Sequence, residues 1–226
     1  MRGELDATPK PGLVDRSDDG AHHDMTYGTF TRSIDAIAPL FGGVPLVAAG
    51  RPVSPDLFAH TRRIGVLAER AMFTATEGVN THKGQIFVLM LLATATVALG
   101  ATTSDSLCDA VRTMTEGMVE NELRRRGADV VYVGVGAPPD RTARRAPSPR
   151  PRPSLYHHRA EEAGETHGQR LFRLYGTTGV RGEAEAGFPA IFETALPVYR
   201  ELRSRGVSRN DAAVHALLAL MTRVED

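Results

Sequence analysis

The sequence predicts an all-α fold, a compact multi-helix bundle, and two observations lead to this prediction. Apolar residues recur at helical spacing through most of the 226 residues, and capping residues precede several of these runs. Only the segment Asp129–Gly136 (DVVYVGVG) has the composition of a β-strand, and one strand cannot form a sheet. With 42% apolar residues the chain can bury a core, and we expect a single domain over residues 1–226.

The N-terminal half contains three predicted helices. Asp24 is the expected cap of the first, whose apolar residues are Phe30, Ile34, Ile37 and Phe41. The second begins with Ser54 as N-cap and Pro55 at the first helical position. The third runs from Ile86 to Leu99 and is the most apolar stretch of the chain, so we expect it to be the most buried helix.

Further helices are predicted downstream. One begins near Ser104, with an apolar face of Leu107, Val111, Met114 and Met118. Another spans residues 187–206, with Pro189 near its start, a kink at Pro197 and Gly206 as its stop. The last opens with the capping-box spacing of Ser208 and Asp211, and its apolar residues are Val214, Leu217, Leu218 and Met221.

Residues 137–154 (APPDRTARRAPSPRPRPS) differ from the rest of the chain. They are rich in Pro and Arg and contain no large apolar side chain, so burial cannot compensate for the entropy lost on ordering. We expect a largely disordered, exposed loop that joins two helical halves. A linker is favoured over a segment that binds partners or nucleic acid.

Charge and composition exclude several classes of protein. The 27 basic residues balance the 27 acidic ones, whereas general nucleic-acid or membrane-surface binding needs a sustained basic field. Cys108 is the only cysteine, which excludes an intramolecular disulfide framework and fits a reducing compartment. The longest apolar stretch has about fifteen residues, fewer than a membrane span needs, and residues 1–10 do not resemble a signal peptide. We expect a soluble, cytoplasmic protein.

Polar, glycine-containing clusters interrupt the helices at Thr8–Met25, Gly78–Gly84 (GVNTHKG) and Glu165–Pro189. Each cluster alone is as well explained by a chain reversal as by a site. Together they exceed what helix connections need, because short loops suffice in a bundle. Glycine permits close approach of a ligand, Lys and Arg bind phosphates, and Asp and Glu hold magnesium. The clusters therefore predict a phosphorylated ligand in a pocket lined by Gly-rich loops and helix N-termini. This pocket is not a P-loop, because GVNTHKG lacks the P-loop spacing.

Four motifs occur in one order: PKPGLVDR, GAHHDM, GVNTHKG and HGQRLFRLYGTTGVRGEAEAGFP. In that order they resemble the triphosphoribosyl-dephospho-CoA synthase family, from about Thr8 to the C-terminus apart from roughly residues 128–164. The family is all-α. Its members transfer the triphosphoribosyl unit of ATP to the ribose 2′-hydroxyl of 3′-dephospho-CoA and release adenine. The product is the prosthetic-group precursor for the acyl-carrier protein of citrate lyase or malonate decarboxylase.

The resemblance implies roles for residues of this chain, because the enzyme must hold a triphosphate and stabilise positive charge on the ribose. The residues expected to bind ATP or its phosphates are Lys10, Gly78, Asn80, Thr81, Lys83, Gly84, Arg181 and Gly182. Asp15 and Glu183 are the expected catalytic carboxylates and magnesium ligands. His82 or His167 is expected to relay a proton to the adenine or from the 2′-hydroxyl, and the sequence does not decide between them.

The resemblance also implies partners and an alternative. ATP and 3′-dephospho-CoA are the expected substrates, and the product passes to a partner transferase and the acyl-carrier protein. The chain is expected to be shorter than full family members at both ends. The alternative is therefore a truncated, catalytically weak homologue that retains nucleotide binding.

Overall fold

The computed structural model describes residues 1–124 and 167–223. Every regular element in these residues is helical, which confirms the all-α prediction. The predicted strand at 129–136 and the predicted loop at 137–154 lie outside the described residues. The chain divides into two compact units, residues 1–116 with 180–226 and residues 117–179. The prediction of a single domain stays a prediction.

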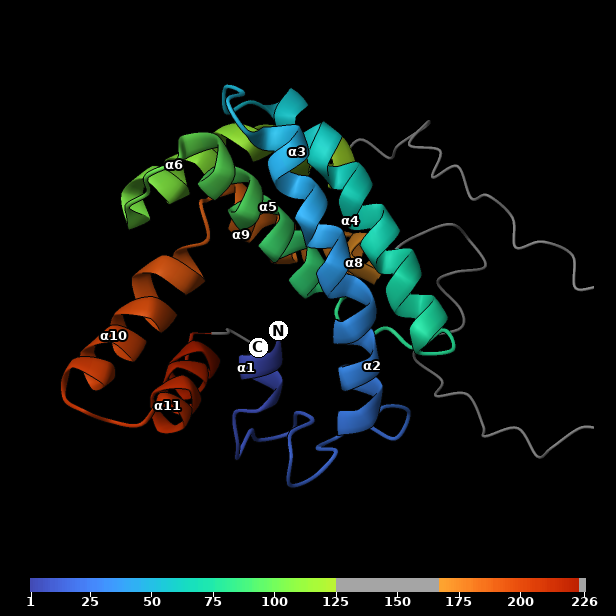
Figure 1. Ribbon diagram of the computed structural model, residues 1–226, viewed down its shortest axis with the longest axis vertical. Coiled ribbons are helices and arrows are strands. Elements are labelled where there is room, and N and C mark those ends of the chain that lie inside the picture. The colour runs from blue at the N-terminus through green and yellow to red at the C-terminus, as the bar shows by residue number, and fades with distance from the viewer. Residues whose placement is uncertain (125–166, 224–226) are drawn as a thin grey trace, which may run out of the picture. The chain divides into compact units, whose positions relative to one another are not determined.

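The first unit contains most of the helices (Figure 1). Its N-terminal part consists of α1 (Arg2–Leu5), α2 (Tyr27–Ile37), the 3-10 segment η1 (Ala38–Gly43), α3 (Val44–Ala48), α4 (Pro55–Ala75), α5 (Lys83–Leu99) and α6 (Ser104–Thr115). Its C-terminal part consists of α9 (Gly179–Glu185), the π-helical segment η3 (Ala190–Ala195), α10 (Leu196–Ser204) and α11 (Arg209–Met221). The second unit contains the π-helical segment η2 (Glu120–Arg124) and α8 (His167–Tyr175).

Helix α5 is a core helix of the first unit and packs against α3, α4 and α6. Its side chains Ile86, Met90, Leu91 and Ala95 are at most 1% exposed. Ile86 joins Ile37 of α2 and Met72 of α4 in one apolar cluster. Burial on several sides explains why this segment is apolar almost all round its axis.

Most helix boundaries follow the capping signals in the sequence. The Ser54 side chain accepts the Leu57 N–H and Pro55 occupies the first turn of α4, as predicted. Ser208 likewise accepts the Asp211 N–H at the start of α11. The predicted cap Asp24 is wrong: Thr26 caps α2 by accepting the Thr29 N–H, because the helix begins two residues later than expected.

The C-terminal helices contain two differences from the sequence pattern. The expected helix over residues 187–206 is π-helical from Ala190 to Ala195, and Pro197 lies in the first turn of α10, where its missing N–H is tolerated. In α11 the buried residues are Ala212 and Ala216, whereas Leu218 and Met221 are 41% and 50% exposed. The small face is buried because alanine permits close packing, and α11 packs against α10 and η3.

The loop Thr8–Met25 folds back on itself. The Ala21 N–H donates to the Gly12 carbonyl at 3.1 Å. Gly20 has φ +58°, and a Cβ at this position would lie 2.5 Å from the Gly12 carbonyl carbon. Glycine at position 20 is therefore explained by close packing of two backbone segments within the loop.

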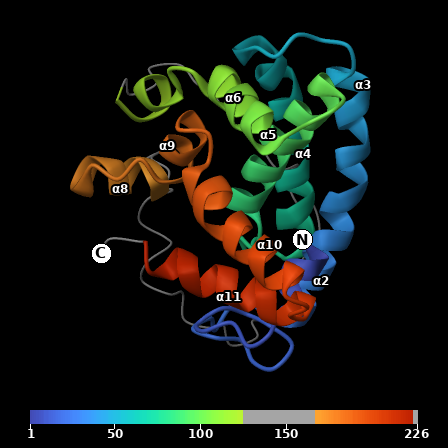
Figure 2. The ribbon, with the colours of Figure 1, turned by 90° about the vertical axis from the view of Figure 1, so that its left-hand side faces the viewer.

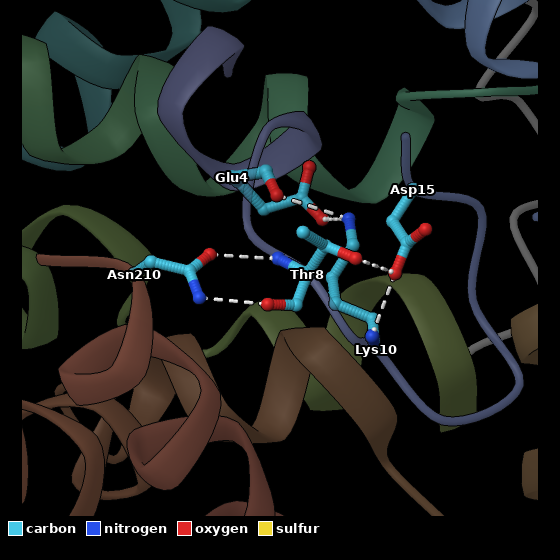
Figure 3. Close-up of polar contacts among 5 residues, drawn as sticks. All are labelled: Glu4, Thr8, Lys10, Asp15 and Asn210. Atoms are coloured by element: carbon cyan, nitrogen blue, oxygen red, sulfur yellow. Dashed lines mark hydrogen bonds and ion pairs between the residues drawn. The ribbon is translucent and has the colours of Figure 1, made fainter. Parts of the chain in front are cut away.

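Helix α11 fixes the beginning of this loop (Figure 2). The Thr8 N–H donates to Asn210 Oδ1 at 2.9 Å, and Asn210 Nδ2 donates to the Thr8 carbonyl at 2.7 Å. One side-chain amide thus satisfies both backbone groups of Thr8, as the close-up in Figure 3 shows.

In the described part of the chain, no single helix is long and apolar enough to cross a bilayer. The bent pair Lys83–Leu99 and Ser104–Arg124 meets the criteria only as a pair, by length and composition.

Candidate functional site

A cavity of about 290 Å³ lies at the N-terminus of α5. Its lining comes from three of the four sequence motifs together with α1, α2 and the first turn of α5. The polar lining residues are Glu4, Lys10, His22, Asn80, Thr81, His82 and Gln85. The apolar ones are Leu13, Val14, Met25 and Phe30. Segments more than fifty residues apart in sequence therefore form one small cavity with a mixed polar and apolar lining.

His82 is the most buried polar residue of this lining and is 2% exposed. Its Nδ1 lies 2.7 Å from Ser33 Oγ and 3.0 Å from Thr81 Oγ1. Its ring and the Phe30 ring form an edge-to-face pair, with an interplanar angle of 74° and a centroid distance of 4.9 Å. Burial lowers the pKa of His82 to about 4, with nearby Glu4 opposing the shift and Lys10 adding to it. The imidazole is therefore neutral at pH 7.

The hydrogen-bond chain around His82 favours one of its two neutral tautomers. Thr81 Oγ1 donates to Ser33 Oγ at 2.7 Å, so the fully buried Ser33 hydroxyl needs an acceptor for its own proton. His82 Nδ1, 2.7 Å away, is an acceptor in the tautomer that has its ring hydrogen on Nε2, so the chain favours that tautomer. Nε2 is buried and has no hydrogen-bond partner among residues 1–124 and 167–223.

Gln85 is a cavity residue that the sequence analysis did not select. Its Oε1 is buried and, like His82 Nε2, has no partner in the described part of the chain. His82 precedes the first residue of α5 and Gln85 lies three positions later, a spacing that places two side chains on one face of a helix. That i, i+3 spacing directly after GVNTHKG is the signal that could have identified it.

Lys10 lines the same cavity, and its side chain is 4% exposed. Its Nζ donates to Glu4 Oε1 at 2.6 Å and to the Glu4 carbonyl at 3.0 Å. A buried ammonium needs such a partner, because the cost of removing it from water is several kcal/mol. Lys10 is thus a buried cation at the cavity wall, already paired with a carboxylate that is 46% exposed.

Asp15 is buried within the loop Thr8–Met25 and does not line the cavity. Its Oδ2 accepts from Lys10 N and Thr8 Oγ1, both at 2.8 Å, and its Oδ1 accepts from the amides of Ser17 and Asp18 (Figure 3 shows the first two). Burial alone would raise the pKa of Asp15, but these hydrogen bonds outweigh it and lower the pKa to about 2. The carboxylate organises the loop that presents Lys10.

The predicted phosphate ligands of GVNTHKG divide into two groups. Asn80 and Thr81 line the cavity, and Asn80 Oδ1 also accepts the Lys83 N–H at 3.2 Å. The Lys83 side chain is 43% exposed, with Nζ 3.5 Å from Glu69 Oε2. Gly78 adopts φ +91°, which favours glycine, and a Cβ at Gly84 would meet no atom within 4 Å. Gly78, Lys83 and Gly84 do not line the cavity.

The predicted residues of the fourth motif that belong to the first unit do not line the cavity. Arg181, Gly182 and Glu183 lie on α9, and Glu183 Oε2 accepts the Ala190 N–H at the start of η3 at 3.1 Å. His167 is the first residue of α8, in the other compact unit. Their predicted roles stay predictions.

The same motif also contains a glycine with a packing role. Gly187 has φ +83°, and a Cβ there would lie 2.9 Å from Arg112 Nε and 3.2 Å from the Cys108 carbonyl of α6. Arg112 Nε donates to the neighbouring Ala186 carbonyl at 3.1 Å. Glycine at this position is explained by the close approach of α6, without a ligand.

The resemblance implies a magnesium ion, for which Asp15 and Glu183 are the predicted ligands. Within residues 1–124 and 167–223, no group of three or more His, Cys, Asp or Glu side chains has the arrangement of a metal site. Both Asp15 oxygens already accept two hydrogen bonds each, and Glu183 Oε2 accepts one from Ala190. These carboxylates do not form a ready-made site, so no chemical step is assigned to a metal.

The chain is similar to known proteins over its whole length. The ATP:dephospho-CoA triphosphoribosyl transferase family matches residues 1–226. The chain is 36% identical over 233 residues to a protein of Vibrio cholerae serotype O1 (strain M66-2) named "Probable 2-(5''-triphosphoribosyl)-3'-dephosphocoenzyme-A synthase", covering 100% of this chain and 64% of the relative. It is 34% identical over 237 residues to the 2-(5''-triphosphoribosyl)-3'-dephosphocoenzyme-A synthase of Pectobacterium atrosepticum, covering 99% of this chain and 64% of that one.

The chain thus spans 64% of the length of these curated relatives. No solved structure matches it. The resemblance predicted from the four motifs is confirmed by both the family match and the relatives.

Proposed function

Because the chain belongs to the ATP:dephospho-CoA triphosphoribosyl transferase family, we propose that it transfers the triphosphoribosyl group of ATP to 3′-dephospho-CoA. The bond between ribose C1′ and adenine N9 of ATP breaks, and the 2′-hydroxyl oxygen of dephospho-CoA bonds to C1′. The proton of that hydroxyl is released and adenine leaves with one proton, so the reaction is balanced. The product is 2′-(5″-triphosphoribosyl)-3′-dephospho-CoA.

The observation that carries this proposal is the composition of the cavity at the N-terminus of α5. Residues from PKPGLVDR, GAHHDM and GVNTHKG, three of the motifs on which the resemblance rests, line it together. A cavity of about 290 Å³ is at the lower end of ligand pockets, which are roughly 300–1,000 Å³, and suits one part of a nucleotide.

The residues of the cavity suggest a division of roles. The apolar walls exclude water from a ribose on which positive charge develops, which strengthens every electrostatic interaction there. Lys10 provides a buried cation for a phosphate, and the start of α5 adds the positive end of a helix dipole. His82 is neutral and its favoured tautomer has the hydrogen on Nε2, so it donates a hydrogen bond without adding positive charge.

We further propose that the reaction takes place in the cytoplasm and that Mg²⁺ accompanies the triphosphate. The product then passes to a partner transferase and an acyl-carrier protein of citrate lyase or malonate decarboxylase. The alternative, a catalytically weak homologue that binds the nucleotide, is favoured by the position of Arg181 and Glu183 outside the cavity lining.

Adenine release tests the proposal directly. The 226-residue protein is incubated with ATP, Mg²⁺ and 3′-dephospho-CoA, and adenine and the triphosphoribosylated product are quantified by chromatography and mass spectrometry. Equal molar amounts of both, formed only with dephospho-CoA present, are expected. ATP binding without adenine release would favour the alternative, and ADP or AMP formation in place of adenine would overturn the transfer reaction.

A further inference from the structure

Two buried polar atoms in the cavity lining have no hydrogen-bond partner within the described residues, His82 Nε2 and Gln85 Oε1. A buried polar group without a partner is unfavourable, because it has lost its hydrogen bonds to water, so a pair of them in one cavity indicates a ligand. The two atoms are complementary, because the favoured tautomer has its hydrogen on Nε2 and Oε1 is an acceptor. They are also not bonded to each other, so each lacks a partner that a third molecule could supply.

The donor at Nε2 is fixed by the rest of the molecule. The chain from Thr81 through Ser33 to Nδ1 favours this tautomer, and contact with the Phe30 ring holds the plane of the imidazole. Because burial keeps His82 neutral, the side chain presents one donor at constant charge. The cavity lining therefore combines an oriented donor at His82, an acceptor at Gln85 three residues later, and several apolar side chains.

An adenine base matches this combination. Its Hoogsteen edge presents N7, an acceptor, beside the 6-amino group, a donor, whereas guanine presents acceptors at both positions. The flat base would lie between the apolar walls formed by Leu13, Met25 and Phe30. We propose that His82 Nε2–H donates to adenine N7 and that Gln85 Oε1 accepts from the 6-amino group.

This assignment rests on the proposed function, because ATP and dephospho-CoA each carry an adenine. It gives Gln85 a role in selecting the 6-amino base, and it places a hydrogen-bond donor on the leaving base of ATP. A 6-oxo purine such as that of inosine triphosphate (ITP) would set its O6 against Gln85 Oε1, acceptor against acceptor. An analogue without N7, such as 7-deaza-ATP, would leave the His82 donor unpaired.

The first test measures binary binding by calorimetry, with one nucleotide at a time and no turnover. The wild-type chain should bind ITP and 7-deaza-ATP about tenfold to a hundredfold more weakly than ATP. Gln85→Met, of similar length but without an acceptor, should bring the ITP and ATP affinities within about threefold of each other. His82→Asn should bind ATP and 7-deaza-ATP equally, and His23→Asn, at an exposed position outside the lining, should retain both preferences.

The results separate the possible failures. Equal wild-type affinity for ATP, ITP and 7-deaza-ATP, together with an unchanged dephospho-CoA affinity in Gln85→Met, overturns the inference even if His82→Asn does not fold. A loss of dephospho-CoA affinity in Gln85→Met with unchanged ATP affinity supports the adenine site and assigns it to dephospho-CoA. Normal discrimination without adenine release overturns the proposed reaction alone, and a wild-type chain that binds neither nucleotide overturns both.

Discussion

Replacing Asp15 by Asn should destabilise the folded protein by about 2–3 kcal/mol, because the carboxylate holds the N-terminal loop together. Oδ1 of the new amide can still accept from the Ser17 and Asp18 amides. Its NH₂ group, however, takes the place of the oxygen that accepts from Lys10 N and Thr8 Oγ1. The Thr8 hydroxyl can rotate and accept instead, but the Lys10 amide is a fixed donor and loses its partner.

The pKa of Asp15 gives a second route to the same magnitude. A carboxyl whose pKa falls from 3.8 to about 2 on folding contributes about 2 kcal/mol in its ionised form. Because the folded pKa is the lower one, this contribution is complete above the unfolded pKa and is lost as the pH falls through the folded value. Wild-type stability should therefore decrease between about pH 5 and pH 2, and Asp15→Asn should lack this part of the decrease.

Urea unfolding at pH 7 and at steps down to pH 2 measures both effects. Asp19→Asn is the matched control, since it removes an equal charge from an exposed position in the same loop. An Asp15→Asn variant within about 0.5 kcal/mol of the wild type would refute the structural role. If an Asp15→Asn variant with wild-type stability loses adenine release, Asp15 has the catalytic role expected from the sequence.

Three further substitutions test other contacts. Asn210→Leu should lower the free energy of unfolding by about 1–3 kcal/mol, because both backbone groups of Thr8 lose their partner, whereas Arg209→Leu beside it should have little effect in the same urea titration. Lys83→Ala should change stability by less than about 1 kcal/mol, since its ion pair with Glu69 is partly exposed. If Lys83 binds the triphosphate, the variant should lose about 1.5–3 kcal/mol of ATP binding free energy in calorimetry, more than it loses for dephospho-CoA. An unchanged ATP affinity assigns Lys83 no phosphate contact. Glu183→Gln keeps an oxygen for the Ala190 N–H and should spare thermal stability while lowering turnover; an unaltered rate at every magnesium concentration would reject its catalytic role.

The sequence by itself determined the all-α class, the family and several helix starts. These depend on local physics or on short motifs: Ser54 and Ser208 cap the helices that they precede, whatever the rest of the chain does. The polar start of α5 was also visible in the sequence, because an apolar helix does not need Asn80, Thr81 and His82 in front of it.

Only the tertiary structure decided which of these residues meet. The cavity combines loops and helices distant in the chain, so no local pattern could show that Lys10 and His82 line it while Arg181 and Glu183 do not. Gln85 was missed because one glutamine in a helix is unremarkable until its oxygen is found buried without a partner. Asp15 was expected to bind a ligand, yet its oxygens accept hydrogen bonds from the loop itself. A carboxylate's role depends on which donors surround it, and folding sets those donors.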